Sequence, residues 1–146
     1  MKIEEFIKQR VENQIVWHSK KSIRNKRYYF LCTWIIIVGS ILSSALISLS
    51  KTLGIITSLL VAISVGVSNA YKFHSKWKLY RLTAELLKHE KILFITGSEK
   101  YNVENTIAEK LFVKTIEEIL MNTNEKWEKI LADITPKKLN EKEYEK

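Results

Sequence analysis

The fold is decided by residues 28–49, YYFLCTWIIIVGSILSSALISL, a stretch without a charged side chain. As an α-helix, this stretch is long enough to cross a hydrocarbon core of about 30 Å. After Lys51, residues 52–71 (TLGIITSLLVAISVGVSNAY) form a second uncharged stretch of nearly the same length. A buried hairpin in a soluble protein would need an apolar cover that the polar remainder of the chain does not offer. The two stretches therefore predict a pair of transmembrane helices joined by a tight turn.

The composition favours an all-α fold. The 146 residues include 4 Gly and 1 Pro, which leaves little material for the many turns of a β-rich fold. Cys32 has no second cysteine to pair with, so an internal disulfide and a thiolate zinc site are excluded. We expect one domain over residues 1–135, with spans at about 28–49 and 52–71, polar helices from 1–27 and 72–135, and a charged tail at 136–146.

Basic side chains gather at one end of both stretches, whereas the turn between them offers Lys51 alone. Cytoplasmic loops are rich in Lys and Arg, so both termini are expected in the cytoplasm. Aromatic residues, which anchor helices at the membrane surface, cluster at the same end. The cations before the first stretch are Lys8, Arg10, Lys20, Lys21, Arg24, Lys26 and Arg27, and those after the second are Lys72, Lys76, Lys78, Arg81, Lys88 and Lys91.

Three cytoplasmic helices are predicted to extend the hairpin. Apolar residues at helical spacing indicate an N-terminal helix that starts at about Lys2 and runs into or close to the first span. Residues 72–95 contain no Gly or Pro, so the second span is expected to continue inward as a stalk until Gly97. A last helix is expected from about residue 102 to 134, before Pro136.

Short motifs on both sides of the spans resemble the SLATT family of small bacterial two-transmembrane proteins, over about residues 10–127. These motifs are Gln14-Ile15-Val16-Trp17, Lys21-Ser22, Asn25-Lys26-Arg27-Tyr28-Tyr29, Phe73-His74-Ser75-Lys76-Trp77, Tyr80-Arg81, Ala84-Glu85-Leu86-Leu87 and Glu90-Lys91. The family is named for its association with SMODS nucleotide synthetases and SLOG nucleotide sensors. The resemblance implies an inner-membrane effector of nucleotide-linked antiphage systems that perturbs or perforates the membrane. His18 departs from the family pattern, which has an aromatic residue there.

Small and hydroxyl-bearing residues mark the candidate pore or packing positions in the spans. Stripes at four-residue spacing, Ser40, Ser44 and Ser48 in the first span and Ser58, Ala62, Gly66 and Ala70 in the second, allow close helix packing in lipid. A second polar face, Thr57, Ser64 and Ser68, is a candidate lining for a narrow aqueous path in an oligomer. The simpler alternative is that these residues close the hairpin on itself or bond back to the helix carbonyls. Because two uncharged helices cannot enclose a pore alone, conduction would require a homo-oligomer.

Two further groups of residues outside the spans are candidate sites. Cations next to the spans can hold anionic lipid headgroups, or alternatively the phosphate of a soluble messenger, with Trp17 or Trp77 available to stack on a base. The members of this group are Lys20, Lys21, Arg24, Lys26, Arg27, Lys76 and Arg81. The second group, interpreted as a buried polar seam or a signal-transmitting switch in which Arg81 pairs with Glu85, comprises Trp17, His74, Trp77, Tyr80, Arg81 and Glu85.

Other classes of function are disfavoured. The net charge of +8 requires an anionic partner, but residues 99–146 hold 9 basic and 11 acidic residues, so we expect lipid and not nucleic acid. The histidines lack metal-ligand spacing, no base is placed to activate Cys32, and no cofactor motif is present, so neither a metal nor catalysis is expected. The expected function is a membrane-perforating effector. A non-conducting anchor that recruits a soluble sensor or enzyme, and a small housekeeping channel, are the alternatives.

Overall fold

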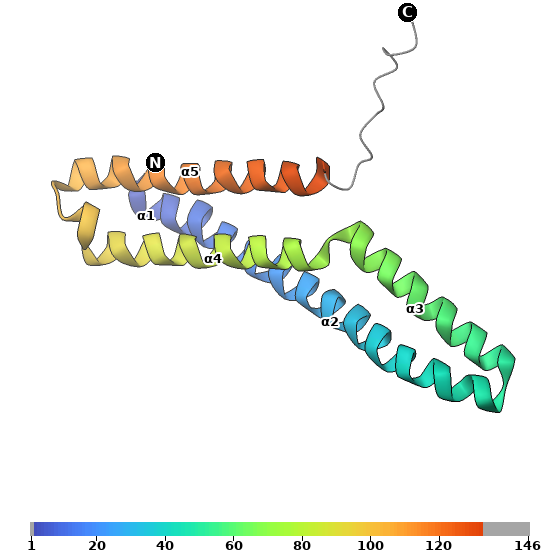
Figure 1. Ribbon diagram of the computed structural model, residues 1–146. Helices are drawn as coiled ribbons and strands as arrows, with labels where there is room; N and C mark the ends of the chain where they lie inside the picture. The colour runs from blue at the N-terminus through green and yellow to red at the C-terminus, as the bar shows by residue number, and fades with distance from the viewer. Residues whose placement is uncertain (1, 133–146) are drawn as a thin grey trace, which may run out of the picture.

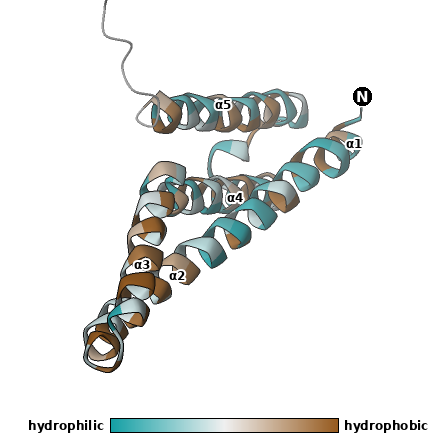
Figure 2. Ribbon diagram, turned by 90° about the vertical axis from the view of Figure 1, so that its right-hand side faces the viewer, coloured by the Kyte–Doolittle hydropathy of each residue, from teal (hydrophilic) through white to brown (hydrophobic). Residues whose placement is uncertain are grey.

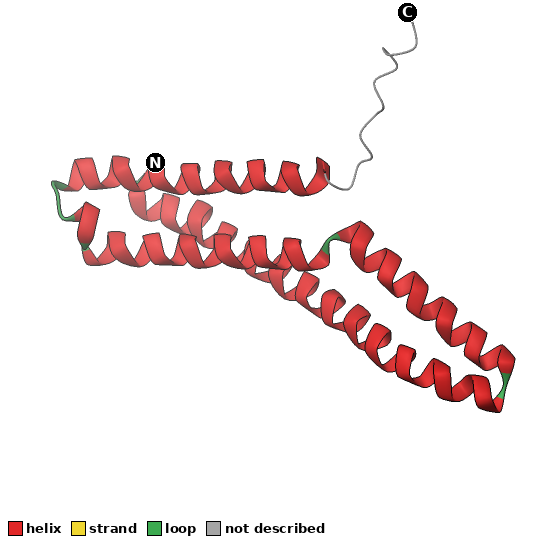
Figure 3. Cartoon of the chain, in the orientation of Figure 1, coloured by secondary structure: helices red, strands yellow, loops and turns green. Residues whose placement is uncertain are grey.

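The computed structural model describes residues 2–132, and within that range every regular element is a helix. The all-α class predicted from the scarcity of Gly and Pro is therefore confirmed. Figure 3 shows the helices separated by short connections. The charged tail predicted at residues 136–146 and the predicted end of the last helix at residue 134 lie outside the described residues.

The N-terminal half of the chain is one long helix. It consists of α1 (Ile3–Phe6), a π-helical turn η1 (Ile7–Val11) and α2 (Glu12–Leu49). Its 47 residues correspond to about 70 Å at 1.5 Å per residue. The π turn, with its wider winding, brings Phe6 and Val11, five residues apart, to the same side, where both are buried. The predicted run of the N-terminal helix into the first apolar stretch is confirmed.

The second apolar stretch folds back along α2 as α3 (Lys51–Tyr71). Ser50 is the turn, with extended backbone angles of φ −158° and ψ 123°. We call the paired residues 28–71 the apolar hairpin, and residues 2–27 with 72–132 the polar bundle. Figure 2 shows that hydrophobic residues dominate α3 and the part of α2 beside it, while α1, α4 and α5 are mixed or hydrophilic.

The two helices of the hairpin meet along a seam with alternating three- and four-residue spacing, which is typical of left-handed helix pairs. The least exposed residues of α2 along this seam and its extension into the bundle are Ser22, Asn25, Tyr29, Cys32, Ile36, Gly39, Ser43 and Leu46. Their counterparts on α3 are Gly54, Thr57, Val61, Ser64 and Ser68.

A break at Lys72 separates α3 from α4 (Phe73–Thr96). Lys72 has φ 49° and ψ 40°, a left-handed conformation that costs a non-glycine residue about 1–2 kcal/mol. The expectation of an uninterrupted helix from the second span through residues 72–95 is therefore wrong. Aromatic stacking fixes the corner, since the Tyr71 and Phe73 rings lie 5.5 Å apart and nearly parallel, and Phe73 also contacts Tyr28. The corner turns α4 across α2, as Figure 1 shows.

The chain then reverses and adds one more helix. Gly97, at φ 60°, ends α4 as predicted, and the amides of Gly97 and Ser98 bond to the carbonyls of Phe94 and Leu93. A 3-10 turn, η2 (Glu99–Tyr101), leads to α5 (Asn105–Ala132), which packs along α4.

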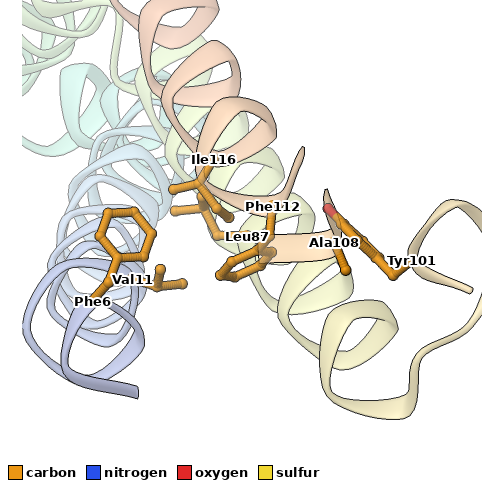
Figure 4. Packing of buried hydrophobic residues seen from close by; sticks show 7 residues of the cluster. All are labelled: Phe6, Val11, Leu87, Tyr101, Ala108, Phe112 and Ile116. Carbon is orange, nitrogen blue, oxygen red and sulfur yellow. The ribbon is translucent and has the colours of Figure 1, made fainter. Parts of the chain in front are cut away.

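The hydrophobic core lies in the polar bundle, at the end far from the hairpin. Its buried members come from α1, η1, α4, η2 and α5, and Figure 4 shows them converging: Phe6, Val11, Leu87, Tyr101, Ala108, Phe112 and Ile116. The rings of Phe94 and Phe112 stack at 4.4 Å. Arg10 holds Glu117 through two hydrogen bonds of 3.1 Å, and Lys91 reaches Glu12 at 2.6 Å. These contacts fasten α4 and α5 to the long helix.

Candidate functional site

The surface of the apolar hairpin is almost entirely exposed. In the most apolar 18-residue segment of each of its two helices, 6% of the residues are buried inside the structure. Both helices are long and apolar enough to cross a membrane. A core helix of a soluble protein passes the same length and composition test, but it is mostly buried, and these two are not.

The structure places the predicted span residues on two different faces. Thr57, Ser64 and Ser68 are half-buried and belong to the seam with α2. Ser40, Ser44 and Gly66 are exposed on the outer surface of the hairpin. The residues of the four-residue stripes thus face outward. The residues predicted to form a second polar face, Thr57, Ser64 and Ser68, instead pack between α3 and α2. The reason is that the hairpin uses alternating three- and four-residue spacing, which four-residue stripes cannot follow.

Most of the placed hydroxyls donate a hydrogen bond within their own helix. Ser40 Oγ lies 2.5 Å from the Ile36 carbonyl oxygen and Ser64 Oγ lies 2.8 Å from that of Leu60. Ser44 and Thr57 bond in the same way to the Ile41 and Leu53 carbonyls. Such bonds use the hydroxyl proton and leave the oxygen as an acceptor on the helix surface.

Two glycines set the closest approach of the hairpin helices, and a third does not. A Cβ added at Gly39 would lie 2.7 Å from Cγ2 of Val61, and one added at Gly54 would overlap the Ile47 side chain. A Cβ added at Gly66 would meet no heavy atom within 4 Å. Gly66 is therefore the only one of the three on a face that is open in the monomer.

Aromatic rings line the junction between the hairpin and the bundle. Tyr29 stacks on His74 with ring centroids 4.8 Å apart, and Trp77 lies 6.1 Å from the same tyrosine. The Lys26 ammonium lies 5.8 Å from the ring centroids of both Phe30 and Trp77. Predicted residues from two regions of the sequence, Lys26, His74 and Trp77, are thus brought together.

A second aromatic cluster lies deeper in the bundle. Tyr80 contacts Trp17, His18 and Trp127 at centroid distances of 5.5, 5.8 and 5.6 Å, so α2, α4 and α5 all contribute. His18 is 4% exposed, and its Nδ1 lies 2.8 Å from the Gln14 carbonyl oxygen. Burial lowers the pKa of His18, although this hydrogen bond acts in the opposite direction. A neutral His18 occupies the place of the expected aromatic residue and packs as one.

The predicted pairing of Arg81 with Glu85 is wrong. Glu85 accepts a bond of 3.2 Å from Lys88 instead, and both Arg81 and Glu85 are exposed. The buried polar contact between α4 and α5 is Thr83 with Thr123, whose hydroxyl oxygens lie 2.9 Å apart. Little in the sequence indicates this pair, since threonine side chains are mostly exposed.

A polar cavity of about 260 Å³ opens between α2 and α4 next to the hairpin. Lys26 and Arg81, both predicted as phosphate or lipid contacts, line it together with Trp77. Its further polar members Ser19, Ser22 and Lys88 were not among the predicted phosphate or lipid contacts. Of the other predicted cations, Lys76 lies 5.0 Å from the Trp127 ring centroid and Lys21 lies 5.2 Å from that of Trp17. Lys20, Arg24 and Arg27 are exposed outside this cavity.

Within residues 2–132, no three His, Cys, Asp or Glu side chains lie close enough together to hold a metal ion. Cys32 is buried in the seam of the hairpin.

These features define an all-helical protein with an exposed apolar helix pair and a polar bundle. Residues 13–108, more than half of the chain, match a family described as a protein of unknown function, DUF4231, and the chain belongs to that family. No curated protein and no solved structure matches it. The match ends within α5, most of which lies beyond it.

Proposed function

We propose that the protein crosses the bacterial inner membrane twice with both termini in the cytoplasm, self-assembles, and perturbs or perforates the membrane when triggered. The observation that carries this proposal is the exposed apolar hairpin. In the most apolar 18-residue segment of each of its helices, 6% of the residues are buried. Soluble monomers rarely expose apolar patches larger than a few hundred Å². Lipid is the solvent that suits this surface, and the cations of the polar bundle at one end suit the cytoplasmic leaflet.

The biological setting comes from the resemblance to the SLATT family, with which membership in DUF4231 is consistent. The protein then acts without catalysis, as an effector in a nucleotide-linked antiphage system. Its partner is a protein that senses or synthesises a nucleotide.

Self-assembly is supported by the outward faces of the hairpin. Ser40 and Ser44 on α2 and Gly66 on α3 are exposed and small, and small residues let helix backbones approach closely in lipid. The hydroxyl oxygens of both serines retain acceptor capacity, which suits the lining of a narrow aqueous path. Ser40, Ser44 and Gly66 are therefore the preferred pore or contact positions.

A test combines subunit mass in mild detergent with dye and ion leakage from liposomes. The wild type is expected to form discrete oligomers that leak. Gly66→Leu should lower both oligomer content and leakage several-fold, because it adds bulk to an outer face where an added Cβ meets no heavy atom within 4 Å. Ile63→Leu, a volume-conserving change at an exposed position of the same helix, is the matched control and should leave both unchanged.

The placement of Thr57, Ser64 and Ser68 in the seam favours a second candidate, a non-conducting membrane anchor that recruits a soluble sensor or enzyme through the polar bundle. These three half-buried residues pack against α2, which supports a role in closing the hairpin. Stable monomers or dimers that leave liposomes tight would support the anchor and contradict the effector. A housekeeping channel, by contrast, predicts leakage together with harmless expression.

A further inference from the structure

We infer that the cavity between α2 and α4 is a binding site for a phosphate group at the membrane surface, that of an anionic lipid headgroup or of a small soluble phosphate. This inference rests on the proposed function only for the position of the membrane. The cavity is lined by Ser19, Ser22, Ile23, Lys26, Trp77, Arg81, Ala84, Glu85 and Lys88.

The charge of the lining is the first argument. Three cations, Lys26, Arg81 and Lys88, face one carboxylate, Glu85. Lys88 neutralises Glu85 at 3.2 Å, which leaves two cations without an acidic partner. Lys26 contacts aromatic rings, and Arg81 makes no hydrogen bond or ion pair with any residue in the range 2–132. An unpaired guanidinium is the side chain best suited to bind phosphate through two parallel hydrogen bonds.

The neutral donors are the second argument. The Ser22 hydroxyl donates a long hydrogen bond of 3.5 Å to the Trp77 carbonyl, and a phosphate oxygen is a stronger acceptor that can replace this carbonyl. Ser19 lies one turn earlier on the same helix and lines the same cavity. Two hydroxyls beside two cations supply the set of donors that the oxygens of a phosphate require.

Size and position limit the ligand. Pockets for whole small molecules usually enclose about 300–1,000 Å³, and this cavity of about 260 Å³ suits a headgroup or a small phosphate, not a dinucleotide. Along α2, Lys26 and Ser22 lie about 3 and 9 Å from the start of the uncharged stretch at residue 28. The polar layer of a bilayer leaflet is about 5–8 Å thick. The end of the cavity at Lys26 therefore lies at the depth of lipid phosphates, and the end at Ser22 lies just outside that layer, toward the polar bundle.

The experiment measures retained ligand by native mass spectrometry of the full chain in detergent, with phosphatidylglycerol or phosphatidylcholine added. A separate arm titrates inorganic phosphate calorimetrically. The double variant Lys26→Gln/Arg81→Gln should lose phosphatidylglycerol retention at least about tenfold. The matched control, Lys20→Gln/Arg24→Gln, removes the same charge from exposed positions outside the cavity and should lose less than about threefold.

A variant that increases binding separates loss of the site from misfolding, because a misfolded chain would not bind more ligand. Glu85→Gln removes the carboxylate and releases Lys88, so it should increase retention. Inorganic phosphate binding that the double variant abolishes, without a preference between lipids, would support the site and assign it to a soluble phosphate. Equal losses in both double variants, or binding of neither probe, would overturn the inference. Since no arm requires leakage or an oligomer, its failure is distinct from failure of the proposed function.

Discussion

At the residue scale, His18 shows how one position serves both chemistry and packing. Its ring is buried between Trp17 and Tyr80, with centroid distances of 4.8 and 5.8 Å. The Nδ1–H group donates a hydrogen bond to the Gln14 carbonyl oxygen, which leaves Nε2 unprotonated in the neutral ring. Charging this ring in the cluster is unfavourable, mainly because burial removes its water, and the pKa of His18 is lowered.

We therefore expect the bundle to lose stability as the pH falls. In the unfolded chain His18 takes up a proton at about pH 6.5, whereas in the folded chain its pKa is lower. The contribution of His18 to the free energy of unfolding is therefore fully present above that pH and is lost as the pH falls below it. His18→Phe should remove this part of the pH dependence. Urea unfolding followed by tryptophan fluorescence between pH 5.5 and 7.5 measures it, with the exposed His89→Gln as control. An unchanged pH profile in His18→Phe would contradict the prediction.

At the scale of the elements, the hairpin and the corner at Lys72 depend on different local rules. The hairpin closes because Gly39 and Gly54 let backbones approach, and the corner forms although Lys72 is costly in a left-handed conformation. The four-residue stripes in the sequence pointed to Gly66 and not to Gly39 or Gly54, and the corner has no Gly or Pro as a signal. The uncharged stretches, the turn and the stop at Gly97 were accordingly predictable, and the break was not.

Gly54→Ala should destabilise the hairpin, since its Cβ overlaps Ile47 and lies 3.1 Å from the Ile47 Cα. Gly66→Ala meets nothing within 4 Å and should leave the hairpin intact. We expect a loss of about 1–3 kcal/mol for Gly54→Ala. Unfolding in sodium dodecyl sulfate, followed by circular dichroism, measures the difference. Equal stability of the two variants would contradict the placement of Gly54 at the close contact between α2 and α3.

Lys72→Ile should weaken the corner. β-Branched residues strongly disfavour the left-handed region, so the substitution biases residues 71–75 toward a continuous helix. The first amides of a helix lack intrahelical acceptors, and in the wild type the backbone bonds of α4 begin with Lys76 to Lys72 at 3.0 Å. A continuous helix would protect the amides of residues 73–75 from hydrogen exchange. Lys72→Gly, which accepts φ 49° without strain, is the control and should not increase their protection.

At the scale of the whole molecule, the polar bundle and the apolar hairpin are built on different principles. The bundle has a core and cross-helix ion pairs, whereas the hairpin has a single seam of small and larger residues and an exposed apolar surface. The predicted seam of Arg81 and Glu85 failed because helix spacing indicates a shared face but not which neighbour it meets. The site at Lys26 and Arg81 was partly predictable, since both residues were identified, but their convergence depends on how α4 crosses α2.

The proposed topology predicts which residues an impermeant reagent reaches. In a Cys32→Ala background, Ser50→Cys at the turn should react with an impermeant maleimide added to cells with a permeabilised outer layer. Lys20→Cys, exposed in the bundle, should react only after the inner membrane is opened. Mass shifts of the purified chains record labelling. Reaction of Lys20→Cys in cells with an intact inner membrane would contradict the proposed orientation and indicate the opposite one.

The long helix from Ile3 to Leu49, formed by α1, η1 and α2, runs through both the polar bundle and the apolar hairpin, so that a motion of one end moves the other. Its polar end packs against α4 and α5, and its apolar end pairs with α3. In the proposed topology, the point where α4 crosses it lies close to the membrane surface and acts as the pivot. For a stiff rod of about 70 Å, a tilt of about 5° moves one end by about 6 Å relative to the other. In the proposed topology, a partner that binds the bundle would therefore need no contact with the spans to displace the turn at Ser50 on the opposite side of the bilayer.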